Sequence, residues 1–141
     1  MNNNVLDSTI WGPPTWYLLH HLAYSYDPNL KKYYTNFFEH FKNLIPCEIC
    51  KKSYNNYIIF KPVNLNSKEE FINWTIYIHN IVNNKLSKKY YTREEVNNIY
   101  QSFDNKKLYN FFSTFLSSSL LLRNNLSECK KLFENLSYIY P

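Results

Sequence analysis

The stretch WGPPTWYLLHHLAYSY, residues 11–26, decides the fold. Its apolar and aromatic residues recur at intervals of three and four, which places them on one face of a helix. That face carries Trp16, Leu19, His20, Ala23 and Tyr24. Pro13 and Pro14 precede the face, and proline suits a first helical turn because the N–H there has no intrahelical acceptor. We therefore predict a helix that begins at these prolines.

The same helical spacing continues along most of the chain. Two capping boxes, Ser67 with Glu70 and Thr92 with Glu95, mark helix starts. Pro46 ends one helix and suits the first position of the next. Further helices are expected over about residues 30–45, 46–57, 67–86, 92–103, 106–122 and 126–138. No segment alternates as a strand does, so the predicted fold class is all-α.

The composition is that of a globular chain with one unusual feature. With 141 residues, 45% of them hydrophobic and 19% aromatic, the chain can bury the core of one compact domain and is not a disordered tail. Gly12 is its only glycine. Phosphate-binding loops and Rossmann folds need several glycines where the backbone approaches the phosphates. Both are excluded, so a nucleotide cofactor has to be held by side chains between helices.

The net charge of +5 comes mainly from lysines spread along the chain. This spread is typical of a solvated surface rather than of a nucleic-acid groove, and we expect no nucleic-acid partner. The most apolar segment, residues 108–122, contains polar residues and is shorter than the roughly 20 residues that cross a bilayer. Residues 1–9 lack the pattern of a secretory signal. We expect a soluble protein, without a membrane span, that stays in the compartment of its synthesis.

Cys47-Glu48-Ile49-Cys50 is the sharpest chemical motif of the sequence. Two cysteines at this spacing at a helix start can close a disulfide, and the helix dipole there stabilises a thiolate. The motif predicts a redox-active dithiol. The alternatives are a pair of buried structural cysteines or half of a zinc site. Zinc needs four ligands, and the sequence has no second cysteine pair or Cys-His cluster at the required spacing, so we expect no metal.

A dithiol that oxidises other thiols needs an electron acceptor, and the sequence offers a place for a flat aromatic one. One side of the helix after Ser67 is polar where the rest is apolar, and an aromatic stripe lies on the first helix. Aromatic stripes are more often core than cofactor walls, but buried amides without partners are costly. We therefore expect a ligand such as a flavin there, with lysines near its phosphates. The residues concerned are Trp16, His20 and Tyr24, then His79, Asn80 and Asn83, then Lys85 and Lys88.

Three motifs in order resemble the Erv/ALR sulfhydryl oxidases, a family of FAD-dependent enzymes. They span Trp11–Tyr26, Ile45–Cys50 and Trp74–Lys88. The similarity is strongest to the short forms encoded by large cytoplasmic DNA viruses. It covers about residues 8–103, which would form the FAD-binding sulfhydryl oxidase domain, and it leaves residues 104–141 as a C-terminal helical extension of unknown role.

The resemblance implies a four-helix bundle plus a short fifth helix cradling FAD, with additional C-terminal helices. Cys47 would receive substrate thiols, and Cys50 would pass electrons to the flavin and on to molecular oxygen, giving hydrogen peroxide. It also implies thiol-containing protein substrates or a dithiol relay protein, a location in the host cytoplasm or the virion, and a homodimer, which the aromatic second helix could support. The implied cofactor-binding residues are Gly12, Trp16, His20, Tyr24, Cys50, His79, Asn80, Asn83, Lys85 and Lys88.

The cysteine count departs from that of the cellular family members, which often carry a shuttle pair of cysteines on a tail. Only Cys129 lies outside the 47–50 motif, so an intramolecular shuttle pair is excluded. A buried Cys129 without redox duty is the favoured interpretation, and cooperation across a dimer is the other. Two further functions stay open: a non-enzymatic helical interaction module with a structural CxxC motif, and a disulfide-exchange protein without its own electron acceptor.

Overall fold

The computed structural model describes residues 7–100, 102 and 104–141. Within these residues it contains seven α-helices, one short 3-10 turn and no strand, so the all-α prediction is confirmed. The elements are α1 (Ser8–Tyr24), η1 (Pro28–Leu30), α2 (Lys31–Phe41), α3 (Glu48–Phe60), α4 (Lys68–Lys85), α5 (Arg93–Tyr100), α6 (Asn105–Arg123) and α7 (Leu126–Ile139).

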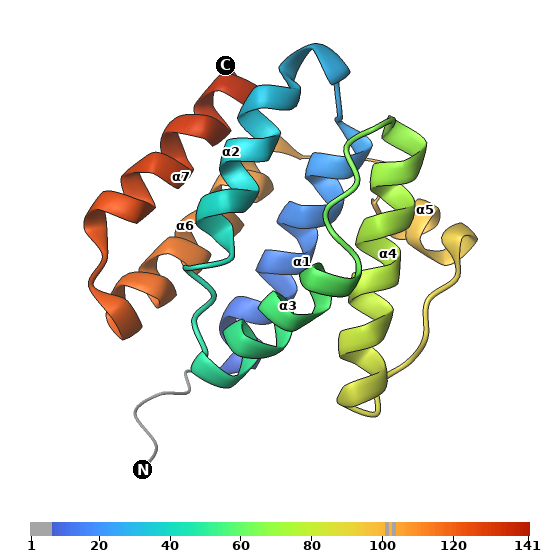
Figure 1. The fold of residues 1–141 in the computed structure, drawn as a ribbon, viewed down its shortest axis with the longest axis horizontal. Coiled ribbons are helices and arrows are strands. Elements are labelled where there is room, and N and C mark those ends of the chain that lie inside the picture. Colours follow the sequence, from blue (N-terminus) through green and yellow to red (C-terminus); the bar gives the residue numbers. More distant parts are fainter. Residues whose placement is uncertain (1–6, 101, 103) are drawn as a thin grey trace.

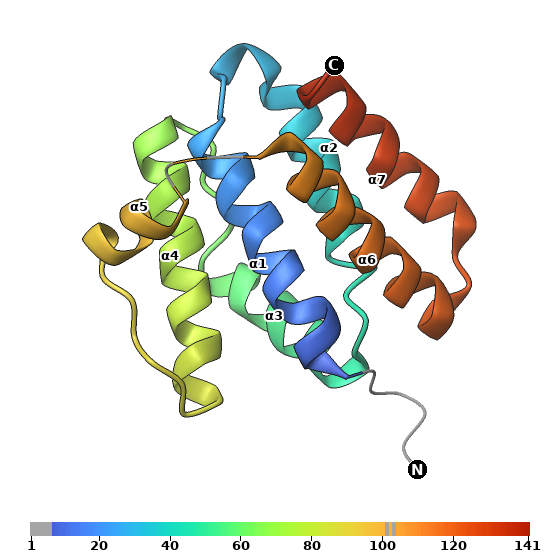
Figure 2. The same cartoon turned by 180° about the vertical axis from the view of Figure 1, so that it is seen from behind.

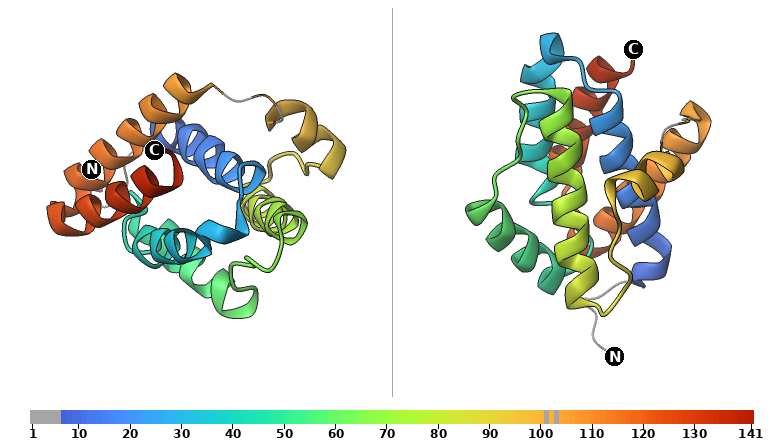
Figure 3. Two further views of the ribbon diagram at one scale, coloured as in Figure 1. Left: turned by 90° about the horizontal axis from the view of Figure 1, so that it is seen from above. Right: turned by 90° about the vertical axis from the view of Figure 1, so that its right-hand side faces the viewer.

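Helix α1 lies in the middle of the molecule (Figure 1). It packs against α6 on one side and against α4 and α5 on the other, while α2 packs against α7. Seen from behind, α6 and α7 form a pair along one flank of the molecule, opposite α4 and α5 (Figure 2). The view from above shows α1 between these two flanks (Figure 3). The segment around α1 thus forms the centre of the fold.

Aromatic side chains join the helices into one core. Phe41 of α2 stacks on Phe115 of α6, with ring centroids 5.4 Å apart, and both rings are almost fully buried. Phe38 of α2 meets Phe71 and Trp74 of α4 edge to face. The apolar face of residues 104–141 therefore packs against the rest of the chain, although Leu121 stays 80% exposed.

Helix α1 begins one turn earlier than the prolines suggested. Asp7 caps it by accepting a hydrogen bond from the Thr9 N–H at 2.9 Å, so Pro13 and Pro14 lie inside the helix. These two prolines leave the carbonyls of Thr9 and Ile10 without their usual i+4 donors. Both of those residues are exposed, so water can satisfy the carbonyls and the helix tolerates the prolines.

The other helix boundaries follow the predicted signals, with one shift. The Ser67 and Thr92 hydroxyls each accept a hydrogen bond from the N–H three residues on, at 3.1 Å and 3.2 Å, which confirms both capping boxes. Helix α2 ends at Phe41 rather than near residue 45, and α3 begins after Cys47, not at Pro46. The predicted end of the fifth helix, Phe103, lies outside the described residues.

The aromatic stripe of α2 is an internal surface. Tyr34, Phe37, Phe38 and Phe41 are all buried, and α2 packs along α7. The stripe rings pack against Phe71 and Trp74 of α4 and against Phe115 of α6, so the stripe itself is not exposed for a homodimer contact, and a homodimer stays a prediction. None of the helices in the described part of the chain has both the length and the apolar character needed to span a membrane.

The stack of Phe41 on Phe115 predicts that the C-terminal helices unfold together with the bundle. Phe115→Ala should lower the free energy of unfolding by about 3–5 kcal/mol, since it leaves a cavity in the shared core. Urea unfolding followed by circular dichroism measures this. Phe133→Ala on α7 is the matched control because Phe133 is 51% exposed. Equal losses in both variants, or a separate early transition for α6 and α7, would contradict a single core.

Candidate functional site

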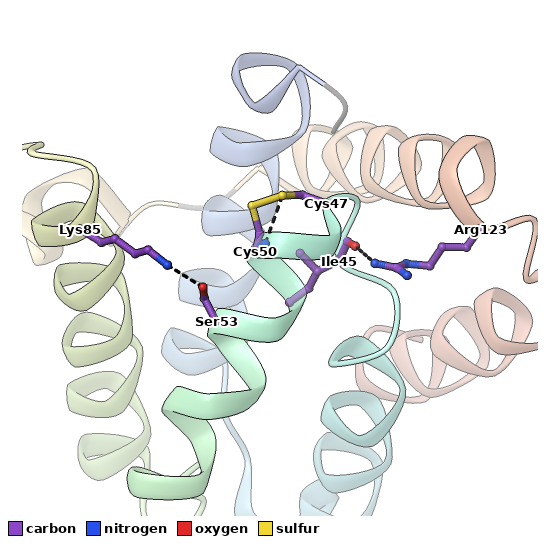
Figure 4. Close-up of a disulfide and its surroundings, with 6 residues drawn as sticks. All are labelled: Ile45, Cys47, Cys50, Ser53, Lys85 and Arg123. Carbon is purple, nitrogen blue, oxygen red and sulfur yellow. Dashed lines mark hydrogen bonds between the residues drawn. A yellow bond between two sulfur atoms is a disulfide. The ribbon is translucent and has the colours of Figure 1, made fainter. Parts of the chain in front are cut away.

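A disulfide joins Cys47 and Cys50 at the start of α3, with the Cα atoms 5.1 Å apart (Figure 4). Cys47 is the N-cap residue, and its Sγ accepts a hydrogen bond from the Cys50 N–H at 3.1 Å. Cys47 is only 3% exposed, whereas Cys50 is half-buried. The free amides of a helix start favour negative charge, so the reduced form of this pair has a ready site for a thiolate.

A cavity of about 400 Å³ opens beside the disulfide, and Cys50 forms part of its wall. Its walls come from α1, α2, α3, α4, α5 and the loops after α2 and α4. The volume falls within the range of small-molecule sites, about 300–1,000 Å³. Rings dominate the lining, as suits a flat ligand: Trp11, Trp16, Phe41, Tyr54, His79, Tyr91 and Tyr100.

Six of the ten residues expected to bind a cofactor line this cavity. They are Gly12, Trp16, Cys50, His79, Asn83 and Lys88. The other four, His20, Tyr24, Asn80 and Lys85, are not among its lining residues and have partners in the protein.

The four remaining residues support the walls from outside. His20 lies behind His79, with its Nε2 2.9 Å from Nδ1 of His79. The Tyr24 hydroxyl donates a hydrogen bond to Asn97 on α5. Lys85 points to α3, where its Nζ donates to the Ser53 hydroxyl at 2.7 Å (Figure 4). These side chains therefore would not touch a ligand in the cavity, and they would affect it only through the residues they hold in place.

The two buried asparagines are satisfied by the protein backbone. The Asn80 side chain donates to the Tyr91 carbonyl at 2.8 Å and accepts from the Tyr91 N–H at 2.9 Å. Asn83 donates to the Lys89 carbonyl at 2.9 Å. Asn80 therefore needs no ligand as a partner, and the side-chain nitrogen of Asn83 already has one in the backbone. They tie the loop after α4 to its helix, and this loop closes one side of the cavity.

Two features of the cavity bear on what it could hold. A Cβ added at Gly12 would meet no atom within 4 Å, so the lone glycine faces open space at the cavity wall. The Tyr54 hydroxyl is buried without a hydrogen-bond partner among the described residues, and Tyr54 is one of the residues that line this cavity. Tyr54 lies one helical turn after Cys50, a spacing that could have identified it from the sequence.

His79 in the cavity wall and His20 behind it are both neutral rings near neutral pH. Trp16 stacks on His79 with centroids 3.9 Å apart and an angle of 6° between the planes. Burial, reinforced by the nearby His79, lowers the pKa of His20 to about 3. Burial and the charge of Lys88 lower the pKa of His79 to about 4. Both imidazoles are therefore uncharged near neutral pH, and they offer stacking surface and hydrogen bonds rather than positive charge.

Besides Tyr54, the cavity residues that sequence reasoning did not assign to the site include Tyr100, Lys89 and Tyr91. Tyr100 stacks on His20 with centroids 4.3 Å apart, and Lys89 and Tyr91 belong to the loop that the asparagines fix. No local pattern marks Lys89 and Tyr91, because they reach the cavity through the path of a loop, whereas Tyr100 comes from the last turn of α5. Within the described part of the chain, no group of three or more His, Cys, Asp or Glu residues is placed to hold a metal ion.

Comparison with known proteins agrees with this geometry. The profile described as the Erv1 / Alr family matches residues 13–117, which extends beyond residue 103 into α6. An African swine fever virus protein (isolate Pig/Kenya/KEN-50/1950), named FAD-linked sulfhydryl oxidase, is 37% identical over 95 residues, covering 64% of this chain and 80% of its own length.

Two further relatives come from other organisms. The probable FAD-linked sulfhydryl oxidase of Acanthamoeba polyphaga mimivirus is 34% identical over 93 residues, 60% of this chain and 64% of that protein. The mitochondrial FAD-linked sulfhydryl oxidase of Saccharomyces cerevisiae is 35% identical over 84 residues, 55% of this chain and 43% of that protein. No solved structure matches the chain significantly.

The lowered histidine pKa values predict a loss of stability in mild acid. An unfolded histidine takes up a proton near its ordinary pKa of 6.5, whereas His20 and His79 stay neutral in the folded chain until the pH approaches their lowered values. Stability therefore falls as the pH drops from about 7 toward 4, by about 2 kcal/mol per histidine at pH 5. Urea unfolding of the cofactor-free protein at pH 7 and pH 5 measures the loss. His20→Gln should flatten the pH dependence, and an unchanged slope would refute the assignment.

Proposed function

The chain belongs to the Erv1/Alr family, and from this premise we propose that it is an FAD-dependent thiol oxidase that forms disulfide bonds in protein substrates. The observation that carries the proposal is the place of Cys50, which belongs both to the disulfide and to the wall of the aromatic cavity. When bound, FAD supplies a two-electron acceptor for the reduced cysteine pair. Two substrate thiols and molecular oxygen would yield one disulfide and hydrogen peroxide, which balances atoms and electrons.

The cavity residues divide into a stacking group and a charged group. Trp16, His79 and Tyr91 supply ring surface, and Gly12 leaves room for close approach to α1. Lys88 lines the cavity on the loop after α4 and suits the phosphates, since an ammonium group binds them as a point charge. Lys89 lines it too, but its ammonium forms an ion pair with Glu95. Lys85 is bonded to Ser53, so we assign it to positioning α3 against α4 rather than to direct phosphate contact.

Thiol exchange takes place at the first turn of α3. A substrate thiolate attacks Sγ of Cys47, the Cys47–Cys50 bond breaks, and Cys50 leaves as a thiolate at the helix start, where charge is stabilised. The second thiolate of the substrate then attacks the substrate sulfur that is bonded to Cys47; the substrate disulfide forms, the bond to Cys47 breaks, and Cys47 leaves as a thiolate. Because Cys47 is 3% exposed, the first attack requires the chain segment that covers this sulfur to move.

The first test separates the roles of the cysteine pair and the cavity. Purified protein should be yellow and consume oxygen when given a dithiol. Cys50→Ser should retain FAD and lose turnover, whereas His79→Ala should weaken FAD binding by about tenfold through loss of its ring contact. Flavin absorbance after gel filtration and an oxygen electrode measure the two properties.

Two results would contradict this assignment. Equal flavin loss in Cys50→Ser and His79→Ala would show that the cysteine pair and the cavity do not have separate roles in turnover and FAD binding. A folded, colourless protein that FAD cannot reconstitute would leave a non-enzymatic helical module with a structural disulfide as the function.

Cys129 has no redox role in this proposal. It is a free cysteine, 4% exposed, and burial raises the pKa of its thiol, which disfavours the reactive thiolate. Cys129→Ser should leave the rate of oxygen consumption unchanged with both a small dithiol and a reduced protein substrate. A loss confined to the protein substrate would show that Cys129 relays electrons.

The partners and location we propose follow the viral relatives. Thiol-containing virion proteins, or a dithiol relay protein, would be oxidised in the host cytoplasm or in the virion. A homodimer remains part of the proposal, although it needs a face other than the buried stripe of α2. Sedimentation of the FAD-bound protein at micromolar concentration tests it, and a monomer at all concentrations would remove it.

A further inference from the structure

Arg123, the last residue of α6, reaches the segment that carries the disulfide (Figure 4). Its Nη1 forms an ion pair with Glu48, the residue directly after Cys47. Its Nη2 donates a hydrogen bond to the Ile45 carbonyl at 2.5 Å. One guanidinium group therefore holds the chain on both sides of Cys47, before the cysteine and in the first turn of α3.

The rest of the segment before Cys47 is braced in a similar way. Glu128 on α7 accepts hydrogen bonds from His40 at 2.8 Å and from Asn43 at 3.1 Å. From the other side, Asn55 of α3 donates to the Lys42 carbonyl at 3.0 Å. The C-terminal helices thus contribute an arginine and a glutamate that fix residues 40–48. This arrangement gives residues 104–141 a contact with the redox pair that their sequence did not reveal.

The charge of Arg123 matters because of where Glu48 lies. A carboxylate adjacent to Cys47 disfavours a thiolate on the reduced pair, since like charges repel. Arg123 is 12% exposed at its side chain and Glu48 is 39% exposed, so the pair is partly shielded from water and less screened than a surface pair. Lys51 and Lys52, on the same helix, add positive charge that is independent of Arg123.

We propose that Arg123 is a positioning residue of the redox centre: it neutralises Glu48 and fixes the Cys47 segment, and so sets how readily the reduced pair forms a thiolate. The inference rests on the proposed thiol oxidase function, but it concerns the dithiol alone and can be measured without FAD turnover. A stabilised thiolate favours the reduced form and makes the disulfide a better oxidant of substrate thiols.

The experiment compares the thiol pKa of the reduced pair in four full-length variants, titrated by thiolate absorbance with Cys129 replaced by serine throughout. Arg123→Gln should raise the pKa of the more acidic thiol by about one unit, a tenfold loss of thiolate. Glu48→Gln should lower it, and the double variant should lie close to the parent. Arg123→Lys keeps the positive charge but not the paired N–H donors of the guanidinium, and it should keep the pKa of the more acidic thiol near the parent value.

Lys130→Gln provides the control, because it removes one positive charge from an exposed site on α7. A pKa shift in Arg123→Gln no larger than in this control, or pKa shifts of the same sign in Arg123→Gln and Glu48→Gln, would overturn the proposal.

Equilibration with glutathione at a pH above the parent thiol pKa gives a second readout, in which the equilibrium of Arg123→Gln should move toward the disulfide. If Arg123→Gln does not fold, Arg123→Lys and Glu48→Gln still test the charge effect. Flavin absorbance, read separately, shows whether any failure lies with FAD binding instead.

Discussion

The contact between the first turn of α3 and the aromatic cavity is the constraint on which the site depends. Cys50 can serve a ligand in that cavity only because α3 begins at Cys47 and brings one sulfur to the wall formed by α1 and α4. A start one turn later would leave both sulfurs in the preceding loop. Helix capping, usually a small stabilising effect, here decides where the chemistry can take place.

The walls of the cavity are held by polar contacts that do not face a ligand. Asn80 and Asn83 bind the backbone of the following loop, and His20 supports His79 from behind. Buried polar groups that are paired make a structure rigid and specific, although Nδ1 of His20 is buried without a partner among the described residues. A binding site prepared in this way loses little conformational entropy when its ligand arrives.

Local signals in the sequence predicted the helices well and the partners of buried polar groups poorly. The boxes at Ser67 and Thr92 involve residues three apart, so the sequence alone specifies them. The amide partners in the loop after α4 depend on the path of that loop, and no periodicity encodes it. Arg123 and Glu48 lie 75 residues apart, and only the tertiary fold brings α6 to the start of α3. The oxidase resemblance located the cavity because its motifs come from the elements that form the walls.

The brace from α6 also bears on the order of events during synthesis. A chain emerging from the ribosome presents both cysteines long before it presents Arg123. Until the last helices are made, the sulfur pair sits on a loosely held segment with an uncompensated carboxylate beside it. The contacts around the cysteine pair are therefore complete only after α6 has been synthesised and has packed against the rest of the chain.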